Sequence, residues 1–360
     1  MKRLPAWADL VLLPMLNLTL AFLVAGLVVA LIGENPVEAL TVMVQGAFVY
    51  PGGIGYTLYY ATNFIFTGLA VAVAYQARLF NIGAEGQAAL GGIGAAALCL
   101  MLDPWLPGLI VLPLAIVAAA AGGVLWAAIP GWLQAYRGSH IVITTIMFNF
   151  IAAGVTVALL SGIMKRDGQP NPETREIAEG ARLPFVHDIA ASLGFEAARS
   201  PLTLAFPLAL LVAFGVWVLI WRTRWGYALR TMGQSEPAAV YAGIPVPRMV
   251  VLAMAVSGAL AGLMAVNEVM GAHGKVTLNF TAGYGFTGIA VALMGRAHPV
   301  GVVLAALLFG ALYQGGAELD FEFQTITREM VLLIQGLIIL FSGALALMFV
   351  PWLSRLLVRP

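Results

Sequence analysis

The chain contains ten long apolar stretches, and this feature most limits what it can fold into. Each stretch approaches the roughly 20 residues that an α-helix needs to cross the hydrocarbon core of a bilayer. Only 10% of the 360 residues are charged, whereas soluble domains carry about 25%. A soluble protein of this size could not bury 61% hydrophobic residues. We therefore expect an all-α, polytopic transmembrane helical bundle that forms one domain over residues 1–360.

The expected spans differ in quality. Three of them are short or rich in glycine, so we expect one or more broken or re-entrant helices among them: 58–77, 86–102 and 279–295. The first span is too long for the core of a signal peptide, and we expect it to be retained. The other expected spans are 10–32, 107–129, 141–163, 202–221, 248–270, 299–317 and 329–350.

The basic residues predict the orientation. If ten spans start inside, the short outer loops carry only Lys275 and Arg328, as the positive-inside rule requires. Both termini are then cytoplasmic, and residues 164–201 form an extracytoplasmic loop with a short helix near 188–198. The basic residues assigned to the cytoplasmic side are Lys2, Arg3, Arg78, Arg137, Arg222, Arg224, Arg230, Arg248, Arg296, Arg355 and Arg359.

Glycine clusters lie inside the spans. Those at 91–94, 122–123 and 258–262 predict close helix packing, because small residues let helices approach in lipid. The series Gly283-Tyr284-Gly285-Phe286-Thr287-Gly288 is dense enough to predict an irregular backbone that lines a cavity.

Several functions are excluded or disfavoured. The net charge of +1 implies no attraction to nucleic acid. The single Cys99 and four scattered histidines give no metal site, and no catalytic constellation is visible. Gly274-Lys275 is followed by Val276, and position 269 is valine, so the phosphate-loop pattern is absent. We expect no enzyme and no cofactor in this chain.

Two polar segments carry the functional signal. In the first, residues 80–87, Asn81, Glu85 and Gln87 lie between apolar stretches, and an ionisable residue at membrane depth is by default a functional candidate. Alternatively, Glu85 lies in a cytoplasmic turn or pairs with Arg78. Glycines beside it would let the backbone break and expose polar groups.

The second segment is the cytoplasmic loop 222–248. Ser235 can cap a short helix that has Glu236 in its first turn, Pro237 near its start and Gly243 at its end. Such a helix suits docking onto a cytoplasmic partner, and an ordinary basic loop is the alternative.

Four segments together resemble the permease family of ATP-binding-cassette importers that includes the branched-chain amino acid and ribose-type permeases. They are 80–87, 140–152 with its Ile-Thr-Thr-Ile-Met-Phe-Asn string, 226–244, and the Gly295–Gly301 turn. They occur in the family's order and fall within about 55–345, and the first two are similar to the nucleoside and simple-sugar branch.

The resemblance implies an inner-membrane permease subunit, with no covalent chemistry of its own, that takes nucleosides or simple sugars from an extracytoplasmic binding protein. Its implied partners are a cytoplasmic ATPase that binds ATP, a second, related permease chain and membrane lipid. A secondary transporter or channel is the rival, although only Glu85 and Glu268 could serve ion coupling. The implied solute-path residues are Asn81, Glu85, Gln87 and Asn149. Phe148 and Tyr284 are added as candidates because an aromatic ring can stack on a nucleobase, as could Phe150 or Phe286, and packing between helices is the alternative for all four. The implied ATPase-coupling residues are Gly226, Arg230, Gly233, Glu236, Pro237, Ala238, Ala239, Tyr241 and Gly243.

The topology gives a first test. In a Cys99→Ala background, cysteines at Gly168 and Gln234 should label from opposite sides of the membrane. Only the first should react with an impermeant thiol reagent added to intact cells. Labelling of both positions from outside would contradict the ten-span arrangement.

Overall fold

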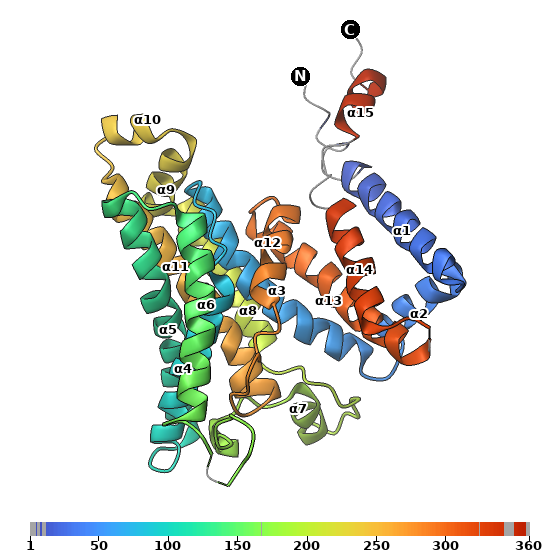
Figure 1. Ribbon diagram of the computed structural model, residues 1–360, viewed down its shortest axis with the longest axis horizontal. Coiled ribbons are helices and arrows are strands. Elements are labelled where there is room, and N and C mark those ends of the chain that lie inside the picture. Colours follow the sequence, from blue (N-terminus) through green and yellow to red (C-terminus); the bar gives the residue numbers. More distant parts are fainter. Residues whose placement is uncertain are drawn as a thin grey trace.

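The protein folds into an all-α bundle, as expected. The computed structural model describes residues 5, 8, 12–166, 168–323, 325–341 and 349–357. Within them, eight helices are long and apolar enough to cross a membrane, and two further apolar helices are shorter. The bundle has two distinct ends: α10 and α15 lie at one end, and α7 lies at the other (Figure 1).

Short turns and loops join most of the helices, which follow one another along the chain. They are α1 (Leu13–Ile32), α2 (Pro36–Phe48), α3 (Gly53–Gln76), α4 (Ala84–Leu102), α5 (Gly108–Arg137), α6 (Ile141–Ser161), η2 (Glu179–Ala181), α7 (Val186–Ser192), α8 (Ala205–Arg222), α9 (Arg224–Gln234), α10 (Glu236–Tyr241), α11 (Val246–Asn267), η3 (Glu268–Ala272), α12 (Tyr284–Met294), α13 (Pro299–Glu322), α14 (Arg328–Ile339) and α15 (Val350–Leu357).

All ten expected apolar stretches contain a helix. Of the three stretches among which a break was expected, 279–295 is broken and holds only the 11-residue α12. The stretch 58–77 is instead unbroken and belongs to the 24-residue α3. Helix α2 was not expected; it begins where the Asn35 side chain accepts a hydrogen bond from the amide of Val37 (3.0 Å). Residues 342–348 of the last stretch lie outside the described residues.

The core is centred on α3, whose apolar residues are mostly buried. It packs against α8, α11, α12 and α13. Beside it, α4, α5 and α11 pack through glycines. A Cβ atom on Gly123 of α5 would lie 2.0 Å from the carbonyl oxygen of Gly258 on α11, and one on Gly91 of α4 would lie 2.5 Å from Gly262. The predicted close approach is thus confirmed, since these backbones touch where no side chain fits.

A second apolar cluster joins the two ends of the chain. It combines residues of α1 and α2 with residues of α13 and α14, and α1 contacts α14 directly. In Figure 1 these helices form the side of the bundle away from α5 and α6.

The helical path breaks between α11 and α12. Helix α11 passes into the π-helical turn η3, and residues 273–283 then form no α-helix. Gly283, at φ 78°, lies in the left-handed region immediately before α12. The irregular backbone predicted for this glycine-rich series is therefore present.

The loop 164–201 is folded onto this break. Its amides donate to carbonyl oxygens in η3 and just after it: Leu183 to Met270 (2.8 Å), Ile177 to Gly274 (2.8 Å) and Thr174 to Val276 (3.1 Å). The helix expected near 188–198 is α7, which starts earlier and ends sooner, because Gly194 adopts a left-handed conformation (φ 82°).

One ion pair ties the same loop to α4. Arg175 donates to both carboxylate oxygens of Asp103 (2.5 and 3.0 Å) and to the carbonyl oxygen of Leu100 (2.8 Å). The Asp103 carboxylate also accepts from the amide of Ala178 (2.9 Å), and its side chain is only 2% exposed. The Arg175 guanidinium holds the pKa of Asp103 below its usual range.

This ion pair predicts an acid-sensitive loop. Since folding lowers the pKa of Asp103, its stabilisation is complete above the unfolded value of about 3.9 and is lost as the pH falls through the lower folded value. Asp103→Asn should therefore accelerate proteolysis within 164–201 at pH 7, up to about tenfold, and the wild type should approach the variant only in strong acid. Glu176→Gln is the control, because it removes an exposed pair with Arg182. Equal cleavage of Asp103→Asn and wild type at pH 7 would contradict this role.

Candidate functional site

Glu85 holds the broken helix in place. From the first turn of α4, its carboxylate accepts hydrogen bonds from the amides of Gly283 (2.9 Å) and Gly285 (2.7 Å), and it also bonds the Thr281 side chain. The first amides of a helix have no partner within that helix and carry its positive dipole end. A carboxylate there satisfies both needs, so Glu85 caps α12 and is not paired with Arg78 in this conformation.

Glycine makes this contact possible. A Cβ atom on Gly285 would lie 2.3 Å from the Glu85 amide nitrogen, so any side chain would push α12 away from α4. The carboxylate reaches the α12 amides only because the two backbones are this close.

Asn81 and Gln87 form a buried amide pair. Asn81 Nδ2 donates to Gln87 Oε1 (2.8 Å), and Gln87 Nε2 donates back to Asn81 Oδ1 (3.0 Å). Asn81 Nδ2 also donates to Ser257 Oγ (2.8 Å), which in turn donates to the Ala70 carbonyl oxygen (2.6 Å). The pair joins α4 to α11 and α3 and leaves little amide capacity for a solute in this conformation, so a path-lining role stays a prediction.

Asn149 contacts the start of α4 from α6. Its Nδ2 donates to the carbonyl oxygen of Ile82 (2.9 Å), and its Oδ1 accepts from the amide of Gly86 (2.9 Å). These bonds attach α6 to the turn that begins α4. Although 64 positions apart in the chain, Glu85 and Asn149 line one pocket of about 130 Å3 between α4, α6 and residues 278–281.

The two predicted aromatic residues lie apart. Tyr284 is buried in an aromatic cluster, 5.6 Å from Phe64 and 6.3 Å from Tyr313 between ring centroids. Phe148 packs against Trp126 at 5.3 Å, and the Trp126 indole donates to its carbonyl oxygen (3.1 Å). Neither is among the residues that line the pocket with Glu85.

Glu268, the second membrane-depth carboxylate, is also engaged by protein groups. It is 1% exposed, accepts from Asn63 Nδ2 (2.5 Å) and lies 3.3 Å from His273 Nδ1. Asn63 Oδ1 in turn accepts from Asn267 Nδ2 (2.9 Å). This network links η3 to α3.

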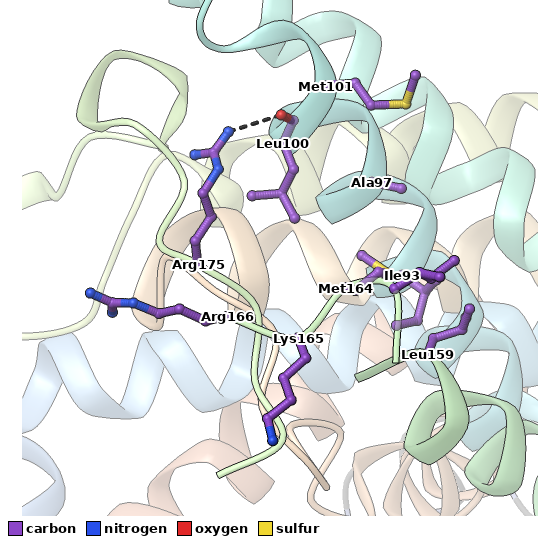
Figure 2. A pocket seen from close by; sticks show the side chains of 10 residues that line it. Ile93, Ala97, Leu100, Met101, Leu159, Met164, Lys165, Arg166 and Arg175 are labelled. Atoms are coloured by element: carbon purple, nitrogen blue, oxygen red, sulfur yellow. Dashed lines mark hydrogen bonds between the residues drawn. The ribbon is translucent and has the colours of Figure 1, made fainter. Parts of the chain in front are cut away.

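A larger cavity of about 760 Å3 lies further along α4 and α6, towards the loop 164–201. Figure 2 shows Arg175 reaching the Leu100 carbonyl, with Ala97 and Ile93 further along α4. The lining is mainly apolar, with Lys165, Arg166 and Arg175 as its cations. None of the predicted solute-path residues lines it.

The loop 222–248 forms two helices where one was expected from the sequence. Thr223 caps α9, and Ser235 caps α10 by accepting from the amide of Ala238 (3.4 Å). Gly243 ends α10 with φ 74°, as expected.

The predicted coupling residues fall into two groups. Gly226, Gly233 and Ala239 are buried, and Cβ atoms on the two glycines would clash with backbone of α8 and α3. Arg230 is half-buried. The exposed members are Glu236, Pro237, Ala238, Tyr241 and Gly243.

Three polar residues of the pocket were not predicted from the sequence. Thr156, Asn279 and Thr281 line it with Glu85 and Asn149. A signal for Thr156 was present, because it lies seven residues after Asn149 and so shares its helix face. Asn279 had no such signal, since it lies in the irregular segment.

Comparisons with known proteins agree with this architecture. The family model described as "Branched-chain amino acid transport system / permease component" matches residues 53–343. The guanosine ABC transporter permease protein NupP of Bacillus subtilis is 37% identical over 94% of this chain and 95% of its own length. The glucose permease protein TsgB13 of Haloferax volcanii is 33% identical over 94% of this chain and 88% of its own. The nucleoside permease protein NupB of Lactococcus lactis is 31% identical over 92% and 90%.

The Glu85 cap gives a direct test. Glu85→Gln keeps one acceptor but removes the charge and one of the two α12 bonds. Since a hydrogen bond to a charged group contributes about 1.5–3 kcal/mol, solute uptake should fall about tenfold or more at equal membrane abundance. Arg78→Gln should have little effect, and the double variant should match Glu85→Gln. Normal uptake by Glu85→Gln would refute the functional role, and rescue by the double variant would establish the Arg78 pair instead.

Proposed function

Because the chain belongs to the family of permease components of branched-chain amino acid-type transport systems, we propose that it is the membrane-spanning permease subunit of an ATP-binding-cassette importer for nucleosides or simple sugars. Three relatives that cover nearly the whole chain are permease proteins for guanosine, glucose and nucleosides. These solutes are neutral and rich in hydroxyl groups. Amides, hydroxyls and one carboxylate at membrane depth suit their recognition.

The observation that carries the coupling part of this proposal is the exposed surface of α10. Val240 and Tyr241 are 61% and 97% exposed at one end of the bundle. On its other face the helix is anchored by the buried Ala239. Its end is closed by the amide of Ile244, which donates to the Ala239 carbonyl oxygen (2.9 Å). A rigidly mounted helix with an exposed aromatic ring is suited to enter a groove on a partner, because aromatic anchors contribute much of the binding energy at interfaces.

The partner is a cytoplasmic ATPase that binds and hydrolyses ATP, while this chain breaks no covalent bond. In this arrangement α9 and α10 face the cytoplasm, as do both termini, and the loop 164–201 faces the extracytoplasmic binding protein. A second, related permease chain completes the path. The whole complex resides in the cytoplasmic membrane, and each permease chain contributes one translocation domain to it.

Transport proceeds by alternating access. Solute delivered at the outer end enters between the two permease chains, and nucleotide-driven movement of α10 is transmitted through α9 to the ends of α3 and α8. The backbone contact between Gly233 and Gln76 makes α9 and α3 move together, since a Cβ atom on Gly233 would lie 1.9 Å from the Gln76 oxygen. Glu85 and Asn149 lie near the solute route, where they couple the start of α4 to α12 and α6.

The ion-gradient alternative has less support. Ion coupling requires a membrane-depth carboxylate able to exchange its ion. Here Glu85 is committed to the start of α12, and Glu268 is bonded to Asn63 and His273.

Coupling is tested on Tyr241. Tyr241→Ala should leave insertion normal but reduce co-purification of the ATPase subunit, as loss of an interface anchor costs about 2 kcal/mol, or thirtyfold in affinity. ATP-dependent uptake should fall with it. Phe195→Ala is the matched control, because Phe195 is 69% exposed in the loop 164–201. Wild-type co-purification and uptake in Tyr241→Ala would remove α10 from the interface.

A further inference from the structure

The pocket that Glu85 and Asn149 share has a composition suited to a ligand. Its walls are largely small residues of α4 and α6, namely Gly86, Ala89, Ala152 and Ala153, which leave a space of about 130 Å3. The irregular segment 278–281 closes its remaining side. Solute sites of transporters commonly form where a broken helix exposes polar groups near the middle of the membrane.

Thr156 is the observation that points to a ligand. Its side chain is only 6% exposed, lines the pocket, and its Oγ1 has no hydrogen-bond partner among the described residues. Threonines inside helices usually donate to the carbonyl four residues earlier, as buried Thr62 does to Leu58 (2.7 Å). A buried hydroxyl without a partner costs free energy, so it indicates a partner that the isolated chain lacks.

Two further polar residues line the same space. Asn279 lines the pocket from the irregular segment and is itself exposed. The Glu85 carboxylate has about four acceptor positions, of which Gly283, Gly285 and Thr281 use three. The lining thus offers both donors and acceptors, includes no cationic residue, and has the Phe280 ring as an apolar face.

Size and chemistry limit the ligand. A cavity of about 150 Å3 accommodates one six-membered ring such as benzene, so this pocket admits one ring and not a whole nucleoside. Free acceptors and an uncompensated hydroxyl favour a ring that carries several hydroxyl groups, and the carboxylate disfavours an anion.

The pocket lies in line with the larger cavity shown in Figure 2. Ala89 lines the pocket and Ile93 lines the cavity, four residues or about 6 Å further along α4. On α6, Val157 lines the pocket and Leu159 lines the larger cavity. The cavity therefore lies between the pocket and the end of the bundle that carries the loop 164–201.

We infer that this pocket is a solute subsite that binds the sugar ring, with Thr156, Asn279 and Glu85 hydrogen-bonding its hydroxyl groups. The inference rests on the proposed function and extends it: a nucleoside and a simple sugar share this ring, so one subsite serves both classes. The base of a nucleoside remains outside, towards the larger cavity.

The decisive experiment pairs a protein hydroxyl with a solute hydroxyl. The complete importer is reconstituted in proteoliposomes, and uptake is measured for guanosine against dideoxyguanosine and for glucose against deoxyglucose. In Thr156→Val, the wild-type preference for the fully hydroxylated solute should shrink about fivefold, as expected for one neutral hydrogen bond. Thermal stability of the variant should be unchanged or higher, because the hydroxyl has no partner among the described residues. Thr62→Val should leave the preference unchanged.

A second pair of variants tests the space itself. Ala153→Phe fills the mouth of the pocket and should reduce uptake at least tenfold, whereas Ala158→Phe makes the same change on an exposed part of α6 outside the pocket and should retain uptake. Wild-type transport with an unchanged solute preference in Thr156→Val would overturn the subsite and leave the proposed function intact. Absence of nucleoside and sugar transport by the wild type would overturn both.

Discussion

The structure depends on satisfying the backbone of α12 inside the membrane. A helix that begins at membrane depth exposes amides where no lipid group can accept their hydrogen bonds. Glu85 supplies two of those bonds, and Gly285 allows it to come close enough. The start of α4 is fixed in turn by Asn149 on α6 and by the hydrogen bond from Asn81 of the amide pair to Ser257 on α11. Four helices thus meet at one short polar segment, and a change in any of them reaches the others.

Much of the fold could be predicted because lipid imposes a simple rule on sequence. Long apolar stretches gave the spans, and the cap residues Ser235 and Gly243 correctly predicted α10. Helix α2 was missed because Glu38 and Gln45 interrupt a stretch of only 13 residues. Helix α9 was missed because Gly226 and Gly233 interrupt its 11 residues, and both glycines are needed for close contacts with other helices.

The candidate site was predictable in residue type but not in arrangement. The polar segment 80–87 predicted the same solute-path role for Glu85, Asn81 and Gln87. The local sequence does not distinguish a side chain that faces a pocket from one that bonds to a neighbouring helix. The structure separates them: Asn81 bonds across 176 positions to Ser257, and Glu85 across about 200 to Gly283 and Gly285. Such long-range partners leave no trace in the spacing of a single sequence.

The second apolar cluster has a consequence for biogenesis. Because α1 packs against α14 as well as against the neighbouring α2, part of its packing surface stays uncovered until α14 has been synthesised. The central helices can assemble around α3 while synthesis continues, but this side of the subunit can close only once α14 is in place. A chain that stalls before α14 would therefore leave one face of α1 without the helix that covers it in the folded bundle.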